Sequence, residues 1–92
     1  MEFEWDPEKA AENLRKHKVS FNEAATTFGD LLGTTASDPD HSAGEQRYIT
    51  VGWSNRGRLL IVAHAERRER IRIISARKLT RSEKIAYEET RK

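Results

Sequence analysis

The sequence contains no cysteine, which excludes disulfide bonds, iron-sulfur clusters and zinc sites built on thiolates. It has no long hydrophobic run either, because the longest, Leu59–Ala63, is far too short to span a bilayer. The first seven residues carry three carboxylates where a signal peptide would be basic and then apolar. From these absences we expect a soluble protein of a reducing cytoplasm, without contact to membranes.

Glycine is scarce too, and its five residues occur singly rather than in a phosphate-binding loop, which disfavours chemistry with ATP or NAD. The three histidines, at positions 17, 41 and 64, are too widely spaced for a local metal motif. We therefore expect no metal and no cofactor. A chain of 92 residues fits one domain, residues 1–92, with a small core and no deep cleft.

Positive charge is concentrated in the second half of the chain. Residues 1–46 hold four basic and ten acidic residues, a net charge of −6, whereas residues 47–92 hold thirteen and five, a net charge of +8. Nine of the eleven arginines lie between Arg47 and Arg81, and the planar arginine fork suits phosphate. A polyanion is the natural partner to test. Alternatively, these arginines form solvated strand faces or pair with the acidic half.

Two segments near the N-terminus carry signals for the start of a helix. Asp6 is an N-capping carboxylate followed by proline at the first helical position, which predicts a helix over Pro7–His17. Ser20 and Glu23 fit a capping box and predict a second, shorter helix that ends near Gly29.

Alternating apolar residues mark the second half of the chain as a sheet. Strands are predicted over 48–53, 59–65 and 71–76, with turns at 54–57 and 67–69 and a weaker strand at 31–37. The strand over 59–65 is apolar on both faces, which predicts the most central position in the sheet. A second capping box, Thr80 with Glu83, predicts a C-terminal helix that ends near Arg91.

The element order predicts an α+β fold class. We expect two N-terminal helices packed on one face of a sheet, then a C-terminal helix. The sheet is predicted as antiparallel, with three to four strands, or five if residues 2–5 add a short strand.

Each histidine has a structural and a functional interpretation. His64 alternates with apolar residues on the central strand, which favours a packed or hydrogen-bonded structural histidine. His17 ends the first helix, where a protonated imidazole suits the helix dipole as well as a functional role. His41 lies in a polar loop four residues before Glu45, where an imidazole beside a carboxylate can transfer a proton; the alternative is a surface residue.

Five arginines surround the last predicted strand, and we expect them to gather near one end of the sheet: Arg67, Arg68, Arg70, Arg72 and Arg77. Such a cluster can hold a phosphodiester and stabilise the charge that develops when a ribose 2′-hydroxyl attacks it. With an acid and a base in place, RNA cleavage needs no metal. The structural alternatives are a salt bridge from Arg77 to Glu83 and a pair between Arg72 and Glu66.

Several segments, taken in this order, resemble the BrnT toxin family: FEWD at 3–6, NLRKHKV at 13–19, Phe21 with Glu23-Ala24, DPDHSAGEQR at 38–47, residues 52–60, RIISAR at 72–77, and Glu83 with Tyr87-Glu88. The likeness covers nearly the whole chain, and its specificity comes from RIISAR combined with the Lys-His and Asp-x-x-His elements. The resemblance implies a RelE-like fold and a bacterial type II toxin, a metal-independent ribonuclease that cleaves RNA and stops translation. It also implies a cognate BrnA-like antitoxin with a ribbon-helix-helix module. The toxin is then expected to bind DNA only indirectly, through this antitoxin.

The resemblance also assigns candidate site residues, position by position: Lys16 and His17, His41, Glu45 and Arg47, Arg67 with its neighbour Arg68, and Arg72 and Arg77. We expect Arg67 and Arg77 to bind and stabilise the scissile phosphate, with His17 or His41 as the catalytic proton-transfer group. The remaining basic residues are expected to bind or guide the RNA: Lys16, Arg47, Arg68 and Arg72. The competing hypothesis is a degenerate toxin that binds nucleic acid or an antitoxin without catalysis.

Overall fold

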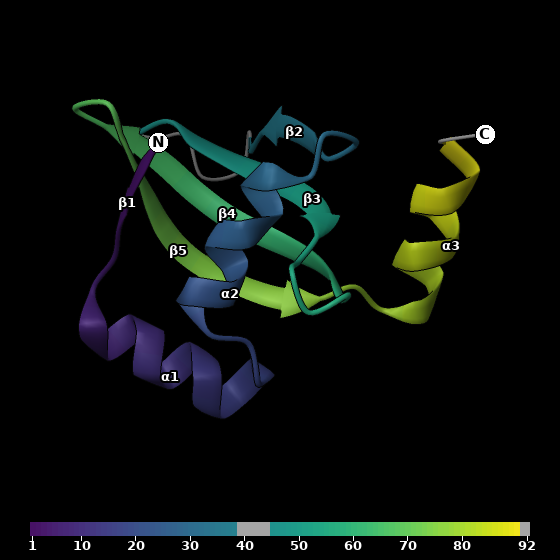
Figure 1. Ribbon diagram of the computed structural model, residues 1–92, viewed down its shortest axis with the longest axis horizontal. Helices are drawn as coiled ribbons and strands as arrows, with labels where there is room; N and C mark the ends of the chain where they lie inside the picture. Colours follow the sequence, from purple (N-terminus) through teal and green to yellow (C-terminus); the bar gives the residue numbers. More distant parts are fainter. Residues whose placement is uncertain (39–44, 91–92) are drawn as a thin grey trace.

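Five strands and three α-helices follow one another in the computed structural model, which describes residues 1–38 and 45–90 (Figure 1). In chain order they are β1 (Glu2–Glu4), α1 (Pro7–His17), α2 (Phe21–Thr26), the short 3-10 helix η1 (Thr27–Gly29), β2 (Thr34–Ser37), β3 (Arg47–Trp53), β4 (Leu59–Arg67), β5 (Arg70–Lys78) and α3 (Arg81–Thr90). The predicted α+β class is confirmed. The second predicted helix differs in detail, because α2 ends at Thr26 and the chain tightens into η1.

The strands lie in the order β1-β5-β4-β3-β2, so β4 is central, as its apolar sequence predicts. Strands β2 to β5 form an antiparallel meander. The prediction of a purely antiparallel sheet is wrong at one edge, because β1 pairs in parallel with β5. Parallel pairing requires a long connection, and here all the chain from α1 to β4 separates the two strands.

Local capping positions α1 and α2. The Asp6 carboxylate accepts a hydrogen bond from the backbone N–H of Glu8 (2.8 Å), and Lys18 ends α1 with a left-handed φ of 60°. The Ser20 hydroxyl accepts one from the N–H of Glu23 (3.0 Å) and so caps α2. These contacts confirm both predicted helix starts.

The core lies between the sheet and the two N-terminal helices, which cover one face (Figure 1). It is built from Val19, Phe21, Ala24, Leu60, Val62, Ile73 and Ala76. Each large member, once fully buried, contributes about 1.5–3 kcal/mol to the free energy of unfolding. Phe3 of β1 packs against this cluster, which explains why so short a strand holds its place at the sheet edge.

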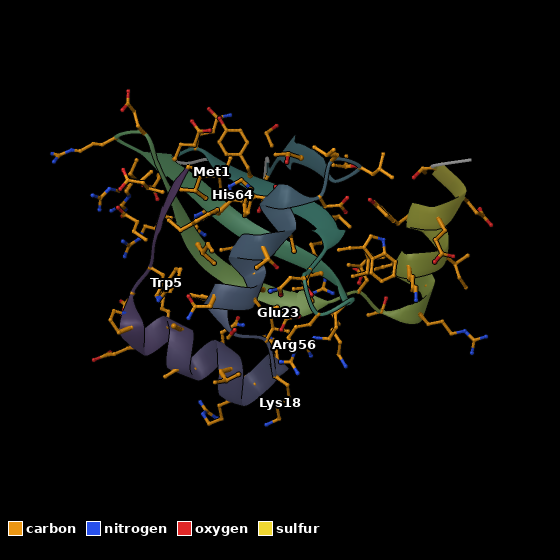
Figure 2. The ribbon with its side chains drawn as sticks, viewed as in Figure 1. Met1, Trp5, Lys18, Glu23, Arg56 and His64 are labelled. Atoms are coloured by element: carbon orange, nitrogen blue, oxygen red, sulfur yellow. The ribbon has the colours of Figure 1, made fainter. Side chains whose placement is uncertain are left out.

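Two buried polar side chains join elements that are distant in sequence. Asn13 of α1 donates to the carbonyl of Ala76 (2.8 Å) and accepts from its N–H (3.1 Å), so it acts as a strand partner for β5 beyond the end of β1. Glu23 of α2 accepts hydrogen bonds from Ser54 and Arg58, and Arg56 lies nearby (Figure 2). The Glu23 carboxylate thus faces the β3–β4 turn rather than closing a reciprocal capping box with Ser20.

Helix α3 lies to the side of the sheet, apart from α1 and α2 (Figure 1). It is a weakly anchored element, since residues 81–90 bury no side chain. Lys84 lies over the Trp53 ring (5.5 Å to its centre), and the Tyr87 hydroxyl donates to the Leu32 carbonyl (3.2 Å). Of the helices described, none has the length and apolar character that a membrane crossing requires.

Candidate functional site

The face of the sheet opposite α1 and α2, here called the open face, combines an apolar middle with arginines at both ends. Cross-strand pairing gives four of the rows on this face: Val51, Ile61 and Arg77; Ile49, Ala63 and Ser75; Arg47, Ala65, Arg72 and Glu4; Arg67, Arg70 and Glu2. The first two rows place small and aliphatic side chains between basic groups. This arrangement suits a chain with a phosphate backbone and flat bases.

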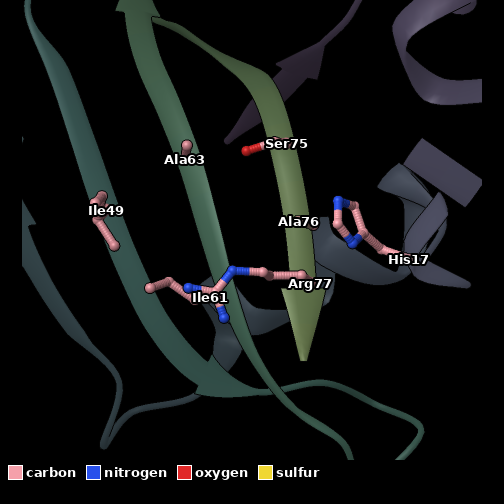
Figure 3. A pocket seen from close by; sticks show the side chains of 7 residues that line it. All are labelled: His17, Ile49, Ile61, Ala63, Ser75, Ala76 and Arg77. Atoms are coloured by element: carbon pink, nitrogen blue, oxygen red, sulfur yellow. The ribbon is translucent and has the colours of Figure 1, made fainter. Parts of the chain in front are cut away.

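A hollow of about 290 Å³ on this face brings two of the predicted catalytic residues together. Its lining includes His17 from the end of α1 and Arg77 from β5, with Ser75, Ile61 and Ala63 among the other residues. Figure 3 shows Arg77 reaching across β4 toward Ile61, while His17 lies on the other side of β5. An imidazole and a guanidinium around one hollow are the groups that proton transfer and phosphate binding require.

Arg77 is held by a carboxylate in this structure. Its two terminal nitrogens donate to the two Glu83 oxygens (2.8 and 3.0 Å), which is a bidentate pair. Glu83 also accepts from the backbone N–H of Thr80 and so completes the predicted capping box of α3. The Arg77 hydrogen bond is the main reason that the pKa of Glu83 falls to about 2. The salt bridge expected as the structural alternative therefore exists, and Arg77 also borders the hollow.

The opposite end of the open face holds a second arginine group. Arg67 pairs with Glu45 (2.5 Å), and Arg72 pairs with Glu4 (3.1 Å). The hydrogen bond from Arg67 holds the pKa of Glu45 below its usual value. A wide hollow of about 770 Å³ is lined here by Glu4, Arg67, Arg68 and Arg70. The expected partner of Arg72 is wrong, because the register places Glu66 opposite Ile71, on the other face of the sheet.

The prediction that all five arginines gather near one end of the sheet is wrong. Arg77 lies within β5, not past it, and is opposite Ile61 on β4, six residues before Arg67. At roughly 3.3 Å per residue the two arginines are about 20 Å apart along the sheet. The reason is that β5 continues to Lys78, so the arginines at the start and at the end of this strand lie at opposite ends of the open face.

The other predicted site residues occupy different surroundings. Lys16 is exposed on α1 and pairs with Glu12 (2.8 Å). Arg47 begins β3 in the same row as Arg72, which places its charge at the Arg67 end. Arg68 lies in the β4–β5 turn with a left-handed φ of 48°. His41 lies outside the described residues.

His64 has the structural role that its sequence position predicts. His64 (labelled in Figure 2) is buried on the helix-covered face. Its Nε2 is hydrogen-bonded to the Thr50 hydroxyl (2.7 Å), and its ring stacks on Tyr48. Burial lowers its pKa from 6.5 to about 4. A neutral, enclosed imidazole of this kind contributes to packing and does not face the hollows of the open face.

Sequence reasoning missed Ser75 and the apolar floor of the site. The alternation of apolar residues in 47–53 and 59–65 contained the signal for this floor, because Ile49, Ile61 and Ala63 fall on the face opposite the core. Ser75 was hidden by a break in the β4–β5 register between Ala63 and His64, which shifts the alternation along β5. Across residues 1–38 and 45–90, no three metal-ligating side chains lie together.

Comparisons with known proteins identify the family of the chain and a solved structure with a similar fold. A protein-family model described as the ribonuclease toxin BrnT of type II toxin-antitoxin systems matches residues 5–83. The fold is similar to the 1.1 Å crystal structure of the Brucella abortus ribonuclease toxin BrnT, with a TM-score of 0.66 and 24% sequence identity. That alignment covers 88% of this chain and 99% of the other. A search of curated protein sequences found no match.

Proposed function

The chain belongs to the BrnT family of ribonuclease toxins of type II toxin-antitoxin systems, and we propose that it cleaves RNA on the open face of its sheet. Membership implies an RNA substrate and an antitoxin partner. The observation that carries the proposal is the hollow of about 290 Å³ that His17 and Arg77 both line.

In the proposed reaction, Arg77 exchanges Glu83 for the scissile phosphate. The ribose 2′-oxygen attacks phosphorus, the bond to the 5′-oxygen breaks, and the products are a 2′,3′-cyclic phosphate and a 5′-hydroxyl. His17 takes the proton from the 2′-hydroxyl or gives one to the leaving oxygen. The guanidinium stabilises the extra negative charge of the transition state, which is the contribution that a metal ion would otherwise make. We therefore infer a metal-independent endoribonuclease.

We propose that the arginines have two different roles. Because Arg67 and Arg77 are about 20 Å apart along the sheet, they cannot hold the same phosphate. We assign Arg77 to the scissile phosphate. Other phosphates of the RNA would then contact the basic group at the opposite end of the open face, which consists of Arg47, Arg67, Arg68 and Arg72.

Helices on one face of a β-meander support a RelE-like classification. We infer that the toxin inhibits translation in the cytoplasm of a bacterial cell and that a BrnA-like ribbon-helix-helix antitoxin neutralises it. The ion pairs of Arg67, Arg72 and Arg77 with Glu45, Glu4 and Glu83 support this partner, because a guanidinium that binds a carboxylate of its own chain can also bind one of an antitoxin.

A cleavage assay with chelator present tests the reaction. Purified wild-type chain is incubated with labelled single-stranded RNA, beside R77A, H17Q and the control R81A, which removes an exposed arginine of α3 that lines neither hollow. We expect cleavage by wild type and R81A, and a loss of about 100-fold or more in kcat/KM for R77A and H17Q.

Folding of each variant is verified by thermal unfolding before its activity is interpreted. A wild-type protein that binds RNA yet yields no product at long incubation would refute the catalytic proposal, and would favour the alternative of a non-catalytic binding module. Controlled expression in a bacterial host supplies a second test, in which growth and protein synthesis should stop for wild type and continue for folded R77A.

A further inference from the structure

A third hollow adjoins the proposed cleavage site on the far side of β5. Its volume is about 270 Å³, and it is lined by Lys9, Glu12, Asn13, Lys16, His17, Ile74 and Ser75. His17 and Ser75 line both hollows, so the two spaces meet at these residues. The two neighbouring hollows, here together called the path, extend from the open face, past the edge of β5, to the side of α1.

The path exists because β5 is only partly covered at this edge. Strand β1 pairs with Arg70–Arg72 alone, and beyond it the side chain of Asn13 takes the place of a strand by bonding the backbone of Ala76. Between these two contacts, the register break leaves Ile74 without a cross-strand partner on β4. Ser75 is exposed and small, so it leaves room above the strand where the hollows join.

The outer wall of the path is a row of charged side chains on one side of α1. Lys9, Glu12 and Lys16 follow at spacings of three and four residues, and therefore lie on the same face of the helix. Lys16 pairs with Glu12 at 2.8 Å and is the main reason that the pKa of Glu12 is lowered, with smaller contributions from Arg15 and Lys9. Two lysines against one carboxylate leave the wall with a net positive charge.

We propose that this path binds the backbone of single-stranded RNA next to the scissile bond, with Lys9 contacting a phosphate that has crossed the edge of β5. The inference rests on the proposed cleavage site, because it extends the same strand of RNA. Each hollow is close to the lower limit of about 300 Å³ for a small-ligand pocket, which suits one unstacked nucleotide and not a duplex. Lys9 is thus a binding residue outside the catalytic group.

Salt-dependent binding tests the path. The probe is a fluorescently labelled 20-nucleotide single-stranded RNA with 2′-O-methyl groups, which lacks the attacking hydroxyl and survives contact with an active enzyme. Wild type, K9A and the control R15A are compared by fluorescence anisotropy between 0.1 and 1 M salt. Arg15 is an exposed basic residue of the same helix that also lies near Glu12 but lines neither hollow, so R15A controls for the loss of one positive charge beside the path.

We expect K9A to lower the slope of log affinity against log salt by about 0.7, the value for one phosphate contact with a single strand. Between 1 M and 0.1 M salt, the affinity of K9A should therefore increase about fivefold less than that of wild type. The slope of R15A should match that of wild type. E12Q, which removes the carboxylate of the wall, should bind more tightly than wild type.

Equal slopes for K9A and R15A would overturn the inference. Cleavage of the unmodified RNA is measured in parallel for wild type, so the two proposals fail separately. A wild type that binds the probe without cleaving the unmodified strand would refute the cleavage proposal alone, while the K9A slope still decides on the path.

Discussion

Replacing Glu83 by glutamine should strengthen RNA binding, because it removes the carboxylate that occupies Arg77. The two side chains are 39% (Arg77) and 38% (Glu83) exposed, so solvent screens their attraction and an ion pair of this kind contributes only about 0.5–1 kcal/mol. Glutamine still accepts the hydrogen bond that caps α3, since both Glu and Gln serve at this position of a capping box. E83Q should therefore keep the helix start and lose the competition for the guanidinium.

The relief of that competition corresponds to about two- to fivefold tighter binding, with a loss of stability of the same 0.5–1 kcal/mol. Binding is measured by anisotropy with 2′-O-methyl RNA, and stability by urea unfolding. E89Q is the matched control, because it removes one negative charge from an exposed position of the same helix. If E83Q bound RNA more weakly than E89Q, Glu83 would hold Arg77 in its working orientation, and the exchange of carboxylate for phosphate would be refuted.

Three further predictions concern stability and are checked by urea unfolding. Burial lowers the pKa of His64 to about 4, so below pH 6.5 the unfolded chain gains a proton that the folded chain does not. The free energy of unfolding should therefore fall by about 2 kcal/mol from pH 7 to pH 5. The fall should be smaller in H64Q. N13A removes three buried hydrogen bonds, to Val19 and Ala76, and should cost about 3 kcal/mol. E69G should gain about 1 kcal/mol, because Glu69 adopts a left-handed φ of 69° in the β4–β5 turn; no gain would show that this turn is unstrained.

The parts of the fold that were predicted correctly depend on signals within a few residues of the chain. The start of α1 follows from Asp6 and Pro7, and the turn at 54–57 follows from its asparagine and glycine. The strands predicted over 59–65 and 71–76 were placed correctly but were too short, since β4 continues to Arg67 and β5 covers Arg70–Lys78. The weaker strand predicted at 31–37 was too long, because β2 begins only at Thr34. Charged residues at strand ends have weak β-propensity, and pairing with the neighbouring strand decides their conformation.

The candidate site depended on contacts across long separations, which local patterns do not contain. The bonds of Asn13 to Ala76 span 63 residues and those of Glu23 to Arg58 span 35. The length of β5 decided that Arg77 and Arg67 lie at opposite ends of the sheet. His17 and Arg77 were both named from the sequence, but only the packing of α1 along β5 places them around one hollow.

The burial of each carboxylate partner separates structural arginines from those of the site. The side chain of Glu23 is only 3% exposed, so loss of Arg58 would leave a charge away from water, and breaking such a pair costs about 3–5 kcal/mol. Glu45 and Glu83 are 34% and 38% exposed, and water solvates them when their arginines move away. The free-energy cost of exchanging a carboxylate for a phosphate is therefore small at Arg67 and Arg77 and large at Arg58. The buried pair of Arg58 with Glu23 thus fixes the β3–β4 turn to α2. The half-exposed pairs of Arg67 and Arg77 hold carboxylates that another anion can replace.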